Sequence, residues 1–381
     1  TNRGTPGGCV LKHRQKPNYL GSLYPVPRKE TGVQGIKCYQ NVADLPETDT
    51  AIIAISSRYV LDTVKVLAYT KNTKGFIIFS AGFSEKDAEG KILEEKVTEV
   101  IETTGGHLLG PNNIGLINQN YAGVFTNPIP KLHPNGADFI SGSGATAVFI
   151  MEAAMEIGLT FSSLYTVGNS AQLGVEDILE HLDETFDPQS SSRIKMLYLE
   201  SIKNPVKFFK HAQSLIGKGC KIAAIKAGSS DAGSRAASSH TGAMVTSDVA
   251  VNALFKKAGI IRCHGRNELV TLVSIWTLPE LNGKNIAIVT HAGGPAVMLT
   301  DSLSKKGFNI PPIKGDKATT LKAQLFPGSS VSNPIDILAT GTADQLGTII
   351  DYCQNYFTEI DAMVVIHGSP GLLSVSDVYQ V

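Results

Sequence analysis

The sequence lacks an excess of charge of either sign. Its 381 residues include 34 Lys and Arg and 34 Asp and Glu, which gives a formal net charge of zero. Balanced charge argues against a general nucleic-acid-binding surface and against attachment to an acidic membrane. Any anionic ligand must therefore be bound by local groups.

Paired cysteines and long hydrophobic runs are also absent from the sequence. The cysteines lie far apart and form no CxxC pair; they are Cys9, Cys38, Cys220, Cys263 and Cys353. This spacing argues against a disulfide framework or a zinc site, so we predict no metal centre and a reducing, cytoplasmic setting. No apolar run approaches the ~18 residues of a membrane span, and we see no signal-peptide pattern. We expect neither a membrane nor a nucleic-acid partner.

Short apolar runs alternate with helical patterns along most of the chain. Strands are predicted at 50–56, 75–82, 137–144, 194–201, 221–228, 285–294 and 361–370. Helices are predicted between them at 145–157, 204–216, 247–258 and 295–306. This alternation is typical of α/β domains with parallel sheets.

Two turn-rich segments, 127–137 and 278–285, are predicted linkers. They divide the chain into domains at 1–128, 129–279 and 280–381. The Gly-rich start "TNRGTPGG" reads as a loop with no strand before it, so we expect the natural chain to begin before Thr1.

Small and polar residues follow the predicted strands of the second domain. Ser141–Gly144, Gly168-Asn169, Glu200 and Ala227–Ser229 each suit an ordinary turn. Ligands of open α/β sheets bind at the carboxyl ends of strands. Together with His240, which follows the last of these turns among small and hydroxyl residues, they indicate one ligand-binding edge.

Two Gly-containing turns, 141–144 and 291–294, each lie between a strand and a helix. The exposed N–H groups of a helix start bind anions. Glycine also simply lets a strand turn tightly into a helix, but two matched turns favour an anion site. Lys226 lies at another strand end, where its side chain either stabilises the fold or neutralises the charge of a bound phosphate. Six other histidines, among them His211, are predicted to lie on the surface or in loops.

The motifs taken together resemble the α-type portion of NDP-forming (ADP-forming) acyl-CoA synthetases, relatives of succinyl-CoA synthetase. The resemblance covers nearly the whole chain and rests on "GTPGG…YPV" (4–26), "SAGFSE" (80–85), "GPNNIGLIN" (110–118), "ISGSGA" (140–145), "VGNSAQL" (167–173), "YLESI" (198–202), "KAGSSDAGSRAASSHTGA" (226–243), "THAGGPAVMLTD" (290–301) and "VSNPIDIL" (331–338). It implies a CoA-binding Rossmann-like domain followed by two flavodoxin-like domains of succinyl-CoA-synthetase type, all with parallel sheets.

The resemblance also implies roles for individual residues. His240 would be the phosphohistidine and Glu200 the carboxylate that orients it. The phosphate-binding helix starts would be Ser143-Gly144 and Gly293-Gly294. The residues matching the CoA-binding motifs are Gly4, Thr5, Pro6, Gly7, Gly8, Ser80, Ala81, Gly82, Phe83, Pro111 and Asn112. Two departures from the family pattern, Gly142 and Asn113, are expected to tune the acyl pocket.

The implied reaction interconverts acyl-CoA, ADP and phosphate with a carboxylic acid, CoA and ATP. CoA, phosphate and ATP/ADP with Mg²⁺ would take part, the nucleotide being bound by an ATP-grasp domain or β subunit that we do not find in this sequence. An oligomer is expected. Two alternatives are an NAD-dependent dehydrogenase, opposed by the missing GxGxxG fingerprint, and a non-catalytic acyl-CoA-sensing module. The joint presence of His240 and Glu200 favours catalysis.

Overall fold

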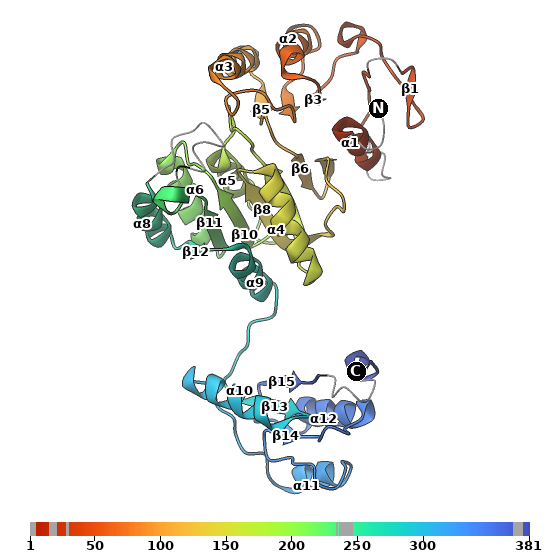
Figure 1. The fold of residues 1–381 in the computed structure, drawn as a ribbon, viewed down its shortest axis with the longest axis vertical. Coiled ribbons are helices and arrows are strands. Elements are labelled where there is room, and N and C mark those ends of the chain that lie inside the picture. Colours follow the sequence, from red (N-terminus) through yellow and green to blue (C-terminus); the bar gives the residue numbers. More distant parts are fainter. Residues whose placement is uncertain (1–4, 15–20, 28–29, 234, 236–246, 369–375) are drawn as a thin grey trace. The chain divides into compact units, whose positions relative to one another are not determined.

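A computed structural model describes residues 5–14, 21–27, 30–233, 235, 247–368 and 376–381 (Figure 1). The chain forms two compact units, Thr1–Leu278 and Pro279–Val381, which are described separately below. All seven predicted strands are present, although most end earlier than expected because their last residues belong to turns. The further division of the first unit into two domains remains a prediction.

The first unit begins with a small parallel sheet of order β3-β4-β5, formed by Thr50–Ile53, Gly75–Ile78 and His107–Leu109. Helices α2 (Val60–Thr70) and α3 (Ala88–Thr103) cover one face through a core that includes Val64 and Ile101. Ile77 and Leu109 lie on the other face and share a core with Val10 of α1 (Pro6–Arg14) and with the next sheet. The short strands Gly32–Val33 (β1) and Ile36–Lys37 (β2) form a separate hairpin.

A seven-stranded sheet of order β12-β11-β10-β8-β9-β6-β7 forms the centre of the first unit. Its strands are Gly115–Asn118 (β6), Tyr121–Val124 (β7), Leu132–Ser141 (β8), Phe161–Thr166 (β9), Ile194–Leu199 (β10), Lys221–Lys226 (β11) and Ile261–Cys263 (β12). The five strands β8 to β12 are parallel, in the order of a flavodoxin-like sheet with its switch point between β8 and β10. The hairpin β6–β7 extends this sheet antiparallel to β9. The predicted α/β fold class is confirmed.

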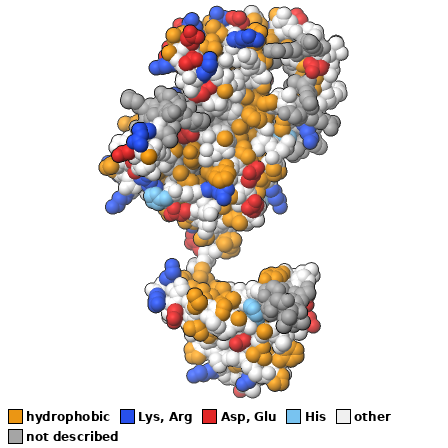
Figure 2. Space-filling model, viewed as in Figure 1, with side chains coloured by type: hydrophobic (Ala, Val, Ile, Leu, Met, Phe, Trp, Pro, Cys, Tyr) orange, Lys and Arg blue, Asp and Glu red, His pale blue; other side chains and the backbone are white. Residues whose placement is uncertain are grey.

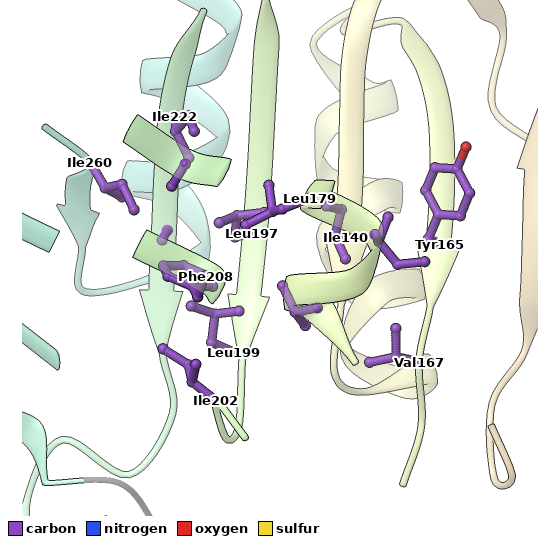
Figure 3. Close-up of a cluster of buried hydrophobic side chains, with 14 of the residues drawn as sticks. Ile140, Tyr165, Val167, Leu179, Leu197, Leu199, Ile202, Phe208, Ile222 and Ile260 are labelled. Atoms are coloured by element: carbon purple, nitrogen blue, oxygen red, sulfur yellow. The ribbon is translucent and has the colours of Figure 1, made fainter. Parts of the chain in front are cut away.

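Helices cover both faces of the flavodoxin-like sheet. One face packs against α4 (Gly144–Glu156) and α9 (Arg266–Trp276). The other packs against α5 (Val175–Glu184), α6 (Pro205–Gly217) and α8 (Asp248–Ala258). Figure 3 shows this second face, where Ile140 and Leu197 of the strands meet Leu179 and Phe208 of the helices. Successive residues of a strand point to opposite faces of the sheet. Because helices cover both faces here, the side chains on both faces are apolar, as is usual in a buried parallel sheet.

The second unit has a three-stranded parallel sheet of order β14-β13-β15. The strands are Ile286–Thr290 (β13), Ile335–Asp336 (β14) and Ala362–Ile366 (β15). Helix α10 (Gly293–Lys305) packs on one face through Ala296. Helices α11 (Asp316–Lys322) and α12 (Ala343–Asn355) pack on the other through Leu321 and Ile349.

The charged surface fits the balanced composition. On the face shown in Figure 2, Lys and Arg side chains are interspersed with Asp and Glu rather than gathered into one basic patch. Among the helices in the described part of the chain, none is long and apolar enough to cross a membrane.

Three expectations about local structure are wrong. Strand β8 begins at Leu132, inside a predicted linker, because Leu132 and Ala137 both pair with Phe161 around a β-bulge. Pro6 to Gly8 form the first turn of α1 rather than a loop, as suits proline at a helix start. His211 is only 3% exposed, because its imidazole bonds to a carboxylate on α5.

That carboxylate, Asp183, joins α5 to α6. Its Oδ2 lies 2.8 Å from Nδ1 of His211, and its Oδ1 accepts hydrogen bonds of 2.7 Å from both Ser214 and Lys218. Burial alone would raise the pKa of Asp183, but the bonds from Lys218, His211 and Ser214 outweigh it and lower that pKa. The charged form is therefore favoured in the folded state.

We predict that Asp183→Asn makes the free energy of unfolding less dependent on pH under acidic conditions. A carboxyl with a lowered native pKa stabilises the fold above its unfolded pKa of about 3.9, and this contribution is lost as pH falls through the native value. Urea titrations between pH 3 and pH 6 should show a smaller loss of unfolding free energy in the variant than in the wild type. Asp62→Asn, at an exposed position on α2, is the control. Equal losses in Asp183→Asn and wild type would contradict the assignment.

Candidate active-site edges

The predicted site residues lie at three places in the structure. Glu200, Ser143 and Gly144 lie at the switch point of the flavodoxin-like sheet, and Gly293 and Gly294 begin α10. The predicted CoA-binding residues lie where the first sheet ends. Gly4 and His240 are outside the described residues.

Glu200 lies directly beside the turn that follows β8. The N–H of Gly142 donates to the carbonyl of Tyr198, at 2.8 Å, across the ends of β8 and β10. A Cβ atom added at Gly142 would lie 3.3 Å from the backbone nitrogen of Glu200 and 3.6 Å from its Cβ. The absence of a side chain at Gly142 therefore keeps space open beside the half-buried carboxylate.

The turn itself is held by two serines. Ser141 Oγ donates to the Ser143 carbonyl at 2.7 Å and accepts the Ser143 N–H at 3.2 Å. Ser143 is the N-cap of α4 and accepts the N–H of Thr146 at 3.3 Å. Burial, together with the nearby charge of Glu200, raises the pKa of Tyr198, whose hydroxyl is bonded to Thr146. The edge thus combines a helix N-terminus, hydroxyl groups and a carboxylate.

The start of α10 has the same turn. Thr290 Oγ1 donates to the Ala292 carbonyl at 2.7 Å and accepts the Ala292 N–H at 3.0 Å. The N-cap here is Ala292, which has no side chain to accept a helix N–H. Gly293 and Gly294 are exposed, and a Cβ at either would meet no atom within 4 Å. No side chain caps or crowds the start of α10, so its first N–H groups can bind an anion.

Charged residues border the segment between β11 and α8, which contains His240. Lys226 ends β11 with 4% of its surface exposed, and its Nζ donates to the Ala227 carbonyl. Burial lowers the pKa of Lys226, and the charges of Asp248 and Glu200 oppose that effect. Asp248, the first residue of α8, is paired with Arg262 at 2.5 Å. Lys226, before the segment, thus lies within electrostatic range of both Glu200 and Asp248, which follows the segment.

The start of α1 meets the end of the first sheet. Thr5 Oγ1 accepts the N–H of Gly8 at 3.3 Å, and a Cβ at Gly7 would lie 3.9 Å from Cβ of Ala54. Ser80 Oγ donates to the Ile55 carbonyl at 2.5 Å, and Asn112 N–H donates to the Ser80 carbonyl at 3.0 Å. A helix N-terminus beside strand ends is an arrangement that binds nucleotide phosphates. These residues therefore fit a CoA-like ligand.

The side chains of two residues at this edge stabilise the fold and are buried away from a ligand. Phe83 is fully buried in the core beneath α2 and α3, so only its backbone is open to a ligand. Asn113 is 3% exposed, and its amide donates to the carbonyls of Ile78 and Leu109 at 3.1 and 3.0 Å. Asn113 fastens the ends of β4 and β5, which does not suit the expected role in an acyl pocket.

Sequence reasoning missed the connection between the two edges of the first unit. Residues 167–173, here named the docking segment, leave β9 and run beside β5. Asn169 N–H donates to the Pro111 carbonyl and Ala171 N–H to the Gly110 carbonyl, both at 3.0 Å. Gly168 has φ +56°, and a Cβ there would lie 2.1 Å from the Pro111 oxygen. The sequence marked Gly168-Asn169 as a polar strand end and "VGNSAQL" as a family motif, but neither signal indicates pairing with residues 110–111.

We predict that the glycines starting α4 and α10 differ in their tolerance of a side chain. A Cβ at Gly144 would lie 2.6 Å from Cγ2 of Ile114, so Gly144→Ala should lower the free energy of unfolding by about 1–3 kcal/mol. Gly294→Ala, which meets open space, should change it by less than about 1 kcal/mol in either direction. Urea unfolding of both variants measures this difference. Equal destabilisation would contradict the packing role of Gly144.

Comparison with known proteins agrees with this geometry. Residues 1–119 match a CoA binding domain, and residues 134–276 match a succinyl-CoA ligase like flavodoxin domain. The acetate–CoA ligase [ADP-forming] II subunit alpha of Pyrococcus furiosus is 33% identical over 325 residues, which is 85% of this chain and 70% of that subunit. The acetate–CoA ligase [ADP-forming] of Methanocaldococcus jannaschii is 32% identical over 344 residues, 90% of this chain but 47% of its own length.

Two solved structures resemble the chain. The dinucleotide forming acetyl-coenzyme A synthetase 1 of Ca. Korarchaeum cryptofilum, in complex with phosphate and ADP, superposes with a TM-score of 0.76 at 26% identity, covering 96% of this chain and 78% of that one. A Pyrococcus horikoshii protein gives a TM-score of 0.73 at 28% identity, covering 99% and 81%. This chain belongs to the family of ADP-forming acyl-CoA synthetases, with the CoA-binding and succinyl-CoA-ligase-like domains of their α subunits.

Proposed function

We propose that this chain binds acyl-CoA and carries the phosphoryl group in an ADP-forming acyl-CoA synthetase. The observation that supports this most is the position of Glu200 beside the Gly142–Gly144 turn, at the switch point of a flavodoxin-like sheet. The strand beside β10 leads into the segment that contains His240. The named relatives are ligases, which favours catalysis over the acyl-CoA-sensing alternative.

CoA is proposed to bind at the end of the first sheet. At the start of α1, the backbone N–H groups of Thr5, Gly7 and Gly8 would bind its phosphate groups, and Pro6, which has no N–H, would begin the helix. Gly4, which is outside the described residues, is proposed to take part as well. The remaining proposed contacts come from Ser80, Ala81, Gly82, the backbone of Phe83, Pro111 and Asn112. The two strand-end segments are hydrogen-bonded to each other through Ser80 and Asn112.

The first chemical step is phosphorolysis of the thioester. An oxygen of inorganic phosphate attacks the carbonyl carbon, the C–S bond breaks, and CoA leaves as a thiolate that takes up a proton. The product is an acyl phosphate. The N–H groups at Ser143-Gly144, which begin α4, are proposed to bind its phosphoryl oxygens and to stabilise charge in the transition state. Gly293-Gly294, which begin α10 in the second unit, are proposed as a further phosphate-binding helix start.

The second step transfers the phosphoryl group to His240. A ring nitrogen attacks phosphorus, the bond from phosphorus to the acyl oxygen breaks, and the carboxylate leaves. Imidazole suits this role because its neutral form is available near pH 7. Glu200 is proposed to accept the other ring N–H, which fixes the tautomer and supports the positive charge that develops on the ring.

The third step passes the phosphoryl group from His240 to ADP. We assign the nucleotide and Mg²⁺ to an ATP-grasp domain or partner subunit, and we expect an oligomeric, cytoplasmic enzyme. A relative described as a subunit alpha supports a separate partner. The acyl group transferred is left open, because further relatives at 30% identity are named 4-hydroxybutyrate–CoA ligase [ADP-forming] and trans-feruloyl-CoA synthase rather than acetate–CoA ligase.

We predict that His240→Ala abolishes phosphoenzyme formation, because it removes the only proposed phosphoryl acceptor. The complete enzyme, including its ATP-grasp module, is incubated with [γ-³²P]ATP and Mg²⁺, and acid-labile label on this chain is measured. His133→Ala, at an exposed histidine, should label like the wild type. Stoichiometric acid-labile labelling of His240→Ala would contradict the assignment of His240 as the phosphoryl acceptor.

We predict that Glu200→Gln slows phosphorylation by ~100-fold, the cost of losing one preorganised charge-stabilising group. Its dissociation constant for CoA should stay within about twofold of the wild-type value, since CoA binds at the other edge. Rapid-quench labelling and calorimetric CoA titration measure the two effects. Glu152→Gln, at an exposed position on α4, is the matched control. A near-normal labelling rate in Glu200→Gln would count against its orienting role.

A further inference from the structure

The docking segment contacts both proposed sites of the first unit. We propose that Asn169 is a positioning residue that fixes the CoA-binding loop, Ser80–Phe83, against the catalytic edge of the flavodoxin-like sheet. This inference rests on the proposed function, because it takes that loop to be a contact of CoA. Asn169 itself is not proposed to touch CoA.

The side-chain amide of Asn169 uses both its donor and its acceptor groups. Nδ2 donates to Oε2 of Glu85 at 2.5 Å and to Oε2 of Glu94, on α3, at 2.8 Å. Oδ1 accepts a hydrogen bond from Nδ2 of Asn112 at 3.3 Å. An amide offers two N–H donors and one carbonyl acceptor, so Asn169 ties together three separate parts of the first domain.

Glu85 transmits this restraint to the CoA-binding loop. Its Oε1 accepts the N–H of Gly82 at 2.5 Å, and both of its oxygens lie 3.3 Å from the N–H of Phe83. Gly82 has φ +101°, which glycine adopts freely along with many other conformations, so its own backbone preference does not fix the loop and the bonds from Glu85 do. The loop shape therefore depends on Glu85, and the position of Glu85 depends on Asn169.

The backbone of the same segment is attached to the catalytic edge. Val167 N–H donates to the carbonyl of Ser141 at 2.9 Å, where the turn before α4 begins. Lys203 Nζ donates to the carbonyl of Ser170, and Lys203 lies three residues after Glu200. The side chain of Asn169 is thus bonded to the CoA-binding side, while its neighbours Val167 and Ser170 are bonded to the catalytic edge.

Charge explains why asparagine is suited to this position. Two carboxylates that share one nitrogen would repel each other and any further anion. A neutral amide satisfies both through its two N–H groups without adding charge. Aspartate has nearly the same shape but would place a third carboxylate against Glu85 and Glu94 and remove both donors.

The test is calorimetric CoA titration of the full chain carrying Asn169→Asp, Glu85→Gln or both. Asn169→Asp sets two carboxylates against each other, and Glu85→Gln sets N–H donors against each other at one of its two contacts. Each single change should weaken CoA binding by about tenfold, in line with the loss of a hydrogen bond to a charged group. In the double variant, the amide introduced at position 85 can accept from Gly82 and donate to the carboxylate introduced at position 169. That carboxylate still faces Glu94, so the double variant should recover only part of the affinity lost in Asn169→Asp, and should bind CoA more tightly than Asn169→Asp.

Asn355→Asp is the matched control, because Asn355 also donates to a carboxylate, Asp351, at 2.8 Å, on the exposed surface of α12. Its CoA affinity should equal that of the wild type. Wild-type affinity in Asn169→Asp, or a double variant that binds CoA no more tightly than Asn169→Asp, would overturn the inference while leaving the proposed function intact. Failure of the wild-type chain to bind CoA would overturn both.

Discussion

The parallel pairing of β8 with β10 is the constraint on which the rest of the structure depends. The chain leaves β8 toward α4 on one face of the sheet and leaves β10 toward α6 on the other. Because these connections diverge, the carboxyl ends of the two strands form the switch point at which open α/β sheets bind ligands. Gly142 and Glu200 meet there, beside the start of α4. A carboxylate and helix N–H groups are thereby held together without any basic cluster, which suits a chain with zero net charge.

The second constraint is the attachment of the first sheet to this edge. Val10, Ile77 and Leu109 share one hydrophobic core with Ile140 and the other residues of the flavodoxin-like sheet. The docking segment adds backbone hydrogen bonds to β5 and a polar network around Asn169. These contacts attach the proposed CoA-binding edge to the proposed catalytic edge, which suits a reaction in which a thioester must meet phosphate.

The sequence predicted the regular parts of this arrangement and missed the irregular ones. Alternating apolar runs located the strands because buried parallel strands leave that signal, and polar strand ends located Glu200 and Ser143. The bulge at Leu132–Ala137 and the hairpin β6–β7 were missed, since pairing with Phe161 and β9 is set by distant residues. The role of Asn169 was equally hidden, because Glu85 and Glu94 lie some eighty residues away along the chain.

The central claim is that His240 carries the phosphoryl group between the acyl phosphate and ADP. The most direct measurement is peptide mapping of the complete enzyme after brief exposure to ATP and Mg²⁺, with digestion at neutral or alkaline pH to preserve phosphohistidine. We predict an acid-labile phosphoryl group on the tryptic peptide 236–256, whose single histidine is His240. Acid-labile phosphate confined to any other peptide of this chain, or acid-stable phosphate on a serine or threonine of 236–256, would contradict the account.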